Sequence, residues 1–171
     1  MGIGEREHNE FKEMLRRCDS TIMKVCLSFT DRRPENIRDL YQEIACTIWE
    51  SWSEFRGESE VKTWVTRIAL NVAGMEIRKR KRRPQFVEID ESIYEFIADE
   101  SNDPRIQQLY SLIDSLEREE DRKIIFLYID KYRLREIADM TGLSEAVVKK
   151  RVQRIKEKLI ELKKQQDEYE R

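Results

Sequence analysis

The apolar repeat between residues 37 and 52 constrains the fold of this chain more than any other feature of its sequence. Apolar side chains recur there at intervals of three and four residues, at Ile37, Leu40, Tyr41, Ile44, Ala45, Ile48, Trp49 and Trp52. These intervals place them on one face of an α-helix, and such a face is stable in water only when other elements cover it. The repeat therefore predicts a long core helix that packs against further helices.

Neighbouring segments predict the partners of this helix. Residues 11–29 carry one apolar face, formed by Phe11, Leu15, Cys18, Ile22, Val25 and Phe29. After Phe55 a third helical run buries a stripe of Trp64, Ile68, Val72 and Met75. The chain of 171 residues has only five Gly and three Pro, which favours helices with short connections over a β fold with many turns. We predict an N-terminal bundle of three to four helices.

The last third of the chain predicts a second helical domain. Asp103 and Pro104 form a helix start, an N-cap followed by proline in the first turn. Gly142 stands at a tight turn, and Ser144 can cap the helix after it. That helix buries Val148, Val152, Ile155 and Leu159, and its other face carries Lys149, Lys150, Gln153, Arg154 and Lys156. This is a helix-turn-helix pattern, which predicts a four-helix domain that reads duplex DNA.

An acidic segment separates the two domains. Its acids are Glu88, Asp90, Glu91, Glu95, Asp99, Glu100 and Asp103, and it has no sustained helical stripe. We interpret it as a linker with at most a weak helical turn. The predicted organisation is all-α, with a bundle over residues 8–83, an acidic linker over 84–103 and a helix-turn-helix domain over 104–164.

Charge and cysteine usage narrow the class further. The formal net charge is only −2, but the cations gather at residues 78–83 and in the last helix. Three cysteines without a CxxC spacing and a single histidine, His8, predict buried free thiols in a reducing compartment and no metal or cofactor. No apolar run reaches the ~18 residues of a membrane span, and the first residues lack the apolar stretch of a signal peptide. We expect a cytoplasmic protein with no membrane insertion.

The run of residues 55–83 has the composition of a surface for a polyanion. It begins with aromatic side chains, continues with a polar stripe of Arg67, Asn71 and Arg78, and ends in six consecutive cations. Aromatic rings can replace the stacking that an unpaired base has lost, and cations can hold phosphates. A solvated basic helix end is the simpler alternative for this segment taken alone.

In combination these segments resemble one family. The matching stretches, in chain order, are DLYQE at 39–43, FRGES at 55–59, TWVTRIALN at 63–71, the basic run, LREIA at 134–138 and VKKR at 148–151. This order and spacing resembles an extracytoplasmic-function (ECF) alternative sigma factor of bacterial RNA polymerase, over nearly the whole chain except the linker and the termini. One departure is Lys131-Tyr132-Arg133, which stands where the family usually has a glycine-containing turn.

The resemblance implies three contact surfaces. The polymerase clamp helices would be bound by Asp39, Leu40, Gln42 and Glu43. The promoter minus-ten element would be bound by Phe55, Arg56, Glu58, Ser59, Arg67, Asn71, Arg78, Arg80 and Lys81, with Phe55 and its loop holding a flipped base. The minus-thirty-five element would be bound by Ser144, Lys149, Lys150, Arg151, Gln153 and Arg154. The implied partners are core RNA polymerase, promoter DNA and an anti-sigma factor.

Two other classes fit parts of the sequence. A free-standing helix-turn-helix regulator with a helical sensor explains the C-terminal third, but leaves the aromatic loop and the basic helix without a role. An enzyme would need a positioned nucleophile, base or metal. The nearest candidates are Asp39 and Glu43, one helical turn apart, and we interpret them as an exposed polar face. We therefore expect a transcription factor without enzymatic activity.

Overall fold

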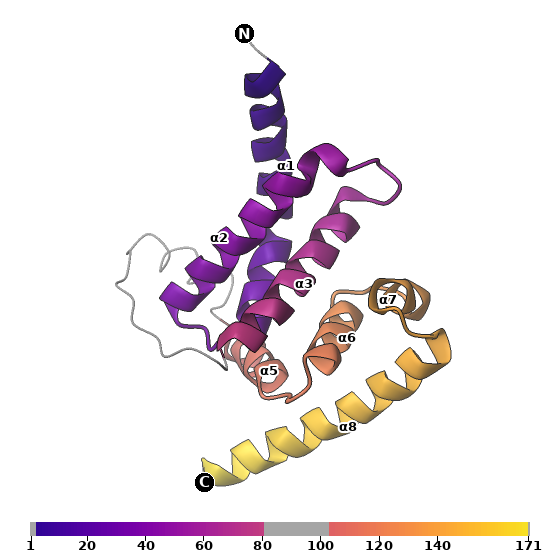
Figure 1. Ribbon diagram of the computed structural model, residues 1–171. Coiled ribbons are helices and arrows are strands. Elements are labelled where there is room, and N and C mark those ends of the chain that lie inside the picture. Colours follow the sequence, from indigo (N-terminus) through magenta and orange to yellow (C-terminus); the bar gives the residue numbers. More distant parts are fainter. Residues whose placement is uncertain (1–2, 81–102, 171) are drawn as a thin grey trace. The chain divides into compact units, whose positions relative to one another are not determined.

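The computed structural model describes residues 3–80 and 103–170, and every regular element in these two ranges is a helix. Figure 1 shows the helices in chain order. The chain divides into two compact units, Met1–Glu95 and Phe96–Arg171. The predicted all-α class with two helical domains is confirmed. Most of the predicted acidic linker lies outside the described residues.

Three helices and a short 3-10 turn form the N-terminal unit: α1 (Ile3–Phe29), α2 (Pro34–Ser51), η1 (Trp52–Glu54) and α3 (Val61–Arg80). Each of α1, α2 and α3 packs against the other two. The repeat that predicted α2 supplies the centre of this core, where Ile37, Leu40, Ile44 and Ile48 are at most 1% exposed. Burying four such side chains contributes roughly 1.5–3 kcal/mol each, before the entropy of ordering the chain is counted.

Two details of the predicted helices are wrong. α1 begins at Ile3, so it extends about two turns before Phe11, where the predicted helix begins. The buried face of α3 is set by Val65, Ala69, Val72 and Ala73, whereas Met75 is 45% exposed. Small side chains face inward because α3 packs against both α1 and α2, and close approach of three helices leaves little room.

Polar contacts join α1 and α2 at the side of the bundle. The Tyr41 hydroxyl on α2 donates a hydrogen bond to the Asp19 carboxylate on α1. Burial, and then this hydrogen bond, raise the pKa of the Tyr41 phenol above its ordinary value. Cys18 and Cys26 are buried as predicted, but Cys46 is exposed, because it lies on the outer face of α2. The prediction that all three thiols are buried is therefore wrong for Cys46.

The C-terminal unit has four helices: α5 (Pro104–Asp114), α6 (Glu119–Ile129), α7 (Leu134–Thr141) and α8 (Glu145–Tyr169). α8 packs against α5, α6 and α7, and Val148, Val152 and Ile155 are its buried residues. The predicted start of α5 is confirmed, since the Asp103 carboxylate accepts from the Arg105 backbone N–H at 2.9 Å. No helix in the described ranges is long and apolar enough to cross a membrane.

A residue in the left-handed conformation follows each of α6 and α7. Gly142 has φ of 70° after α7, and the Leu143 N–H returns to the Ala138 carbonyl at 3.2 Å. Lys131 has φ of 69° after α6, and the Tyr132 N–H returns to the Leu127 carbonyl at 3.0 Å. Both closures satisfy carbonyls at the end of a helix, an arrangement that normally favours glycine. The turn predicted at Gly142 is confirmed.

Candidate nucleic-acid interfaces

Three aromatic rings meet where the chain passes from α2 into α3. The rings of Trp52 and Phe55 are stacked, with centroids 5.9 Å apart and planes 9° from parallel. The Trp64 ring, on the first turns of α3, lies 5.0 Å from Phe55 and 6.1 Å from Trp52. Such packing orients each ring and leaves Phe55 only partly covered. The connection therefore presents a fixed aromatic wall.

This wall borders an open cleft of about 860 Å³. The cleft is lined by Ser53, Glu54, Phe55, Arg56, Glu58, Ser59, Trp64 and Arg67. It brings together five of the residues that the sequence assigned to minus-ten DNA. Sequence reasoning missed Ser53 and Glu54 and favoured a core position for Trp64. Glu54 could have been predicted to line the cleft, because it directly precedes Phe55 in the sequence.

Local backbone geometry shapes the loop beside the cleft. The Phe55 N–H donates to the Trp52 carbonyl at 3.2 Å, which closes η1 and turns the chain outward. Gly57 has φ of 71°, a left-handed conformation that side chains disfavour. At the far side, the Trp64 N–H donates to the Glu60 carbonyl at 3.1 Å and starts α3. The loop between these points carries Arg56, Glu58 and Ser59, all exposed.

The remaining minus-ten residues lie farther along α3. Asn71 is exposed one turn after Arg67, so the two share one face of the helix. Arg78 is exposed near the end of α3. Arg80 is the last residue of α3, but its side chain is not among those described, and Lys81 lies outside the described residues. The basic run is thus described only at its beginning.

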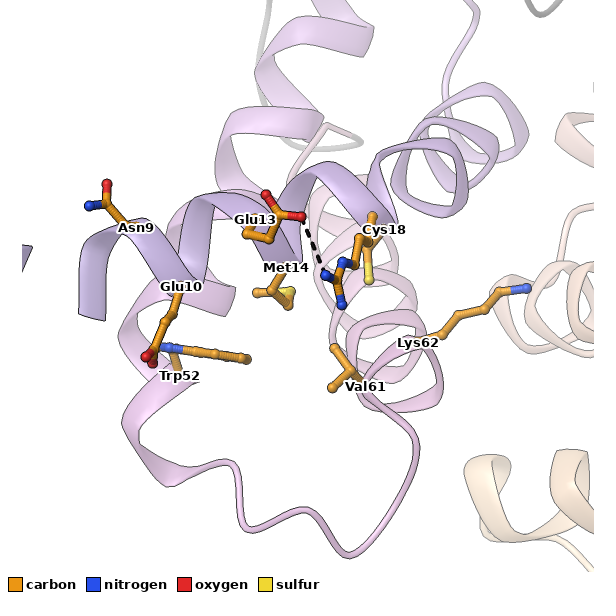
Figure 2. A pocket seen from close by; sticks show the side chains of 9 residues that line it. Asn9, Glu10, Glu13, Met14, Cys18, Trp52, Val61 and Lys62 are labelled. Carbon is orange, nitrogen blue, oxygen red and sulfur yellow. Dashed lines mark hydrogen bonds and ion pairs between the residues drawn. The ribbon is translucent and has the colours of Figure 1, made fainter. Parts of the chain in front are cut away.

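A second hollow, of about 660 Å³, lies in the same unit between α1, Trp52 and the start of α3. Figure 2 shows Met14 of α1 and Val61 of α3 on either side of it, with the Trp52 ring beside them and Lys62 pointing away. At its rim the Arg17 guanidinium donates to the Glu13 carboxylate at 3.3 Å. Trp52 therefore contributes to this hollow while it also stacks on Phe55 at the cleft.

The residues assigned to the polymerase divide into two groups. Asp39, Gln42 and Glu43 are exposed on the outer face of α2. Leu40 is only 1% exposed and belongs to the core of the bundle, so its side chain does not reach the surface. The assignment of Leu40 to the polymerase contact stays a prediction, and in this structure its side chain supports the core beneath the exposed residues of α2. The apolar repeat itself had already placed it on the inner face.

The helix-turn-helix presents a polar face on α8. The Ser144 hydroxyl accepts from the Val147 N–H at 3.3 Å, so this residue caps the helix. Lys149, Lys150, Gln153 and Arg154 are exposed on the side away from the buried valines. The Gln153 amide donates to the Glu157 carboxylate at 3.2 Å within the same helix. Three cations and an amide thus share one accessible face near the start of the helix.

Two cations of α8 face the domain instead. The Arg151 guanidinium donates to the Glu120 carboxylate of α6 at 2.7 Å, and Asp121 lies 4.0 Å away. Lys156 donates to the Tyr128 hydroxyl, also on α6, at 2.7 Å. These bonds span the α6–α8 contact. Lys156 therefore does not belong to the open face on which the sequence placed it. Arg151 pairs with α6 in the free chain, and its assignment to the minus-thirty-five element stays a prediction.

Comparison with known families and structures identifies this architecture. The sigma-70 region 2 family matches residues 14–83, and the sigma-70 region 4 family matches residues 106–159. A probable RNA polymerase sigma factor, RfaY, from Xanthomonas campestris pv. campestris is 24% identical over 145 residues, which cover 80% of this chain. The chain spans 36% of the length of that relative.

Two solved structures share the fold. The sigma factor RpoE, crystallised with the anti-sigma factor NepR from Bartonella quintana, superposes with a TM-score of 0.69 at 21% identity, covering 91% of this chain and 97% of RpoE. CnrH, in complex with the cytosolic domain of CnrY, gives a TM-score of 0.60 at 22% identity, covering 91% and 88%. The two family matches together cover well over half of the chain. The chain therefore belongs to the sigma-70 family, and its region 2 and region 4 units form the architecture of an ECF sigma factor.

Proposed function

We propose that this protein binds core RNA polymerase and directs it to promoters, where it recognises two DNA elements, helps to melt the DNA and starts transcription. The observation that carries this proposal is the pairing of two different surfaces in one chain. One is an aromatic cleft suited to an unpaired base, and the other is a helix-turn-helix face suited to duplex DNA.

The cleft supports the melting step. A base that leaves the duplex loses its stacking, and an aromatic wall can restore roughly 1–3 kcal/mol per base. Phe55 and Trp64 offer such a wall, and Arg67 and Asn71 extend from it along α3. The proposed minus-ten surface is therefore the cleft and this face of α3. Arg78, Arg80 and Lys81 would continue it along the DNA backbone.

The exposed face of α8 supports recognition of the minus-thirty-five element. Arginine and lysine can pair with guanine in the major groove, and glutamine with adenine. Lys149, Lys150, Gln153 and Arg154 carry these groups on one accessible face. The outer face of α2, with Asp39, Gln42 and Glu43, is the proposed contact with the polymerase, because acids there complement a basic partner.

An anti-sigma protein is a further proposed partner. RpoE was crystallised with the anti-sigma factor NepR, and CnrH with the cytosolic domain of CnrY, and both share the fold of this chain. Inhibition by a protein that covers one of the two DNA-binding surfaces would be consistent with these complexes. We propose no enzymatic activity for the chain, since sigma factors act as recognition subunits of the polymerase.

In vitro transcription tests the proposal. The purified protein is mixed with core polymerase and a genomic promoter library, and start sites are mapped. We expect a discrete set of starts with a shared sequence upstream, absent with core alone. A free-standing regulator would instead shift an operator without polymerase, and would add no new starts to core enzyme. That result would contradict the proposed function.

A further inference from the structure

The hollow between α1, Trp52 and the start of α3 is a feature that the proposed function does not use. Its volume of about 660 Å³ falls within the roughly 300–1,000 Å³ that is typical of small-molecule sites. The residues that line it are different from those assigned to the polymerase and to the two promoter elements. The hollow can therefore hold a ligand of its own.

Apolar and neutral groups form the inner walls of this hollow. Met14 and Cys18 line it from α1 and are only 6% and 4% exposed, and Val61 lines it from the first turn of α3. Burial raises the pKa of the Cys18 thiol, so this group stays neutral near pH 7. Water in such a space finds few polar partners. The inner walls therefore favour an apolar molecule.

The Trp52 ring forms one side of the hollow and is held in place by other rings. It stacks on Phe55 at 5.9 Å, and it lies 6.1 Å from the Trp64 ring and 6.3 Å from the Phe11 ring. Figure 2 shows the ring nearly edge-on. Because the ring is already ordered, a ligand that packs against it costs little further entropy. The face of an indole ring also attracts cations.

Two carboxylates at the rim of the hollow differ in how closely they are paired. The Arg17 guanidinium donates to the Glu13 carboxylate at 3.3 Å, a hydrogen-bonded ion pair. Glu10 lies farther from its partner, at 3.9 Å from the Arg6 guanidinium, and the two side chains are 65% and 89% exposed. Water screens such a pair, which contributes little to stability. Glu10 can therefore exchange its partner at low cost.

Glu10 also stands beside the aromatic side of the hollow. Figure 2 shows its side chain directed from α1 toward Trp52, whereas Lys62 points away from the hollow. A carboxylate and an indole ring at the same rim both attract a cation. Because they adjoin apolar walls, the combination fits a molecule with an apolar body and one ammonium group.

We propose that this hollow binds a small amphipathic amine. The apolar body packs against Met14, Cys18 and Val61, and the ammonium group lies between the Glu10 carboxylate and the Trp52 ring. The ligand is held without a covalent bond, and its ammonium group replaces Arg6 as the partner of Glu10. The site does not depend on the proposed function, because all of its groups belong to the N-terminal unit of the free chain.

Three probes that differ in one charged or neutral group test the class of ligand. 4-Phenylbutylamine is a cation at pH 7, 4-phenylbutan-1-ol is neutral, and 4-phenylbutanoate is an anion. The full chain is labelled with ¹³C at its methionine methyl groups and titrated in phosphate buffer, since Tris is itself an amine. Met14 lines the hollow and reports binding by NMR, whereas Met75, which is 45% exposed elsewhere on α3, is the internal control.

We expect the Met14 signal to shift while the Met75 signal does not. The amine should bind about tenfold more tightly than the alcohol, and the anion should bind more weakly than both. The Met14 signal is assigned by its loss in Met14→Leu. Equal affinity for the three probes, equal shifts of the two signals, or no shift with any probe would each overturn the inference.

Substitutions assign the preference to Glu10 and the binding to the hollow. Glu10→Gln should remove the preference for the amine over the alcohol but retain binding of the alcohol. Glu5→Gln makes the same change at an exposed position of α1 that does not line the hollow, and it should retain the preference. Val61→Trp fills the hollow and should abolish binding of all three probes. A preference for the amine that survives Glu10→Gln would refute the site, whether or not Val61→Trp folds.

Discussion

The Arg151 guanidinium lies 2.7 Å from the Glu120 carboxylate, so the start of α8 is joined to the start of α6 through a cation that the family pattern places among DNA contacts. This hydrogen bond holds the pKa of the Glu120 carboxyl below its usual range. Its contribution to stability is therefore present near neutral pH and is lost as the pH falls through that depressed pKa. We interpret Arg151 as a residue that positions α8 against α6.

The salt dependence of DNA binding distinguishes positioning from contact. Each phosphate contact contributes about 0.9 to the slope of log affinity against log salt concentration. Arg151→Ala should leave this slope unchanged in the complex with core polymerase, while lowering stability by at most about 1 kcal/mol. Lys149→Ala, on the exposed face, should reduce the slope by about one contact. An equal reduction in both variants would show that Arg151 contacts phosphate.

Removing the ring of Phe55 should impair promoter opening. Phe55→Ala takes away one wall for an unpaired base, worth roughly 1–3 kcal/mol. We expect about a tenfold or larger loss of open complexes, measured by permanganate reactivity of the melted strand, with unchanged binding to core polymerase. Met75→Ala is the control, since this side chain is 45% exposed on α3 and does not line the cleft. Normal opening by Phe55→Ala would refute the assignment of the cleft.

Reversing the charge of Asp39 should weaken retention by the polymerase. Asp39 is exposed on the outer face of α2, where its replacement does not disturb the core. Asp39→Arg places a cation against the proposed basic partner, and we expect about tenfold weaker co-purification with core enzyme. Glu117→Arg makes the same charge change at an exposed position of the C-terminal unit. If both variants co-purify like the wild type, α2 does not contact the polymerase through this residue.

The Tyr41–Asp19 hydrogen bond should make stability fall in alkali. The pKa of the Tyr41 phenol is raised in the folded chain by burial and by its bond to the carboxylate. In the unfolded chain it titrates near its ordinary value of about 10. The contribution of the neutral Tyr41 phenol to the free energy of unfolding is therefore fully present below about pH 10, and it decreases as the pH rises above that value. Chemical denaturation should show a steeper loss for wild type than for Tyr41→Phe, and parallel curves would contradict this role.

The sequence predicted the helices well because apolar intervals of three and four residues report helical burial directly. It was less accurate for the faces of α3. Two overlapping stripes run along that helix, one with Trp64 and Met75 and another with Val65 and Ala69. The first stripe has the larger apolar side chains and was therefore predicted to be buried. In the structure the second stripe is buried, because α3 packs closely against both α1 and α2. The apolar repeat of a single helix does not show how closely two other helices pack against it.

The candidate sites show the same limit. The residues on the exposed face of α8 could be predicted because polar side chains alternate there with a buried stripe. Arg151 could not be separated from them, since only the fold brings Glu120 of α6 beside it. Cys46 was predicted to be buried because free cysteines are usually buried in proteins, whereas its position on the outer face of α2 exposes it. Contacts between distant segments decided these cases.

The left-handed turn at Lys131 has a practical consequence for every variant above. A non-glycine residue at φ of 69° carries strain of about 1–2 kcal/mol, of which about 0.4–1 kcal/mol would be lost again to the greater freedom of an unfolded glycine. Lys131→Gly should therefore raise the melting temperature by a few degrees. Lys131 lies in none of the proposed contact surfaces. The Lys131→Gly chain is therefore a more stable background in which destabilising substitutions at the cleft or on α8 can be studied without loss of folding.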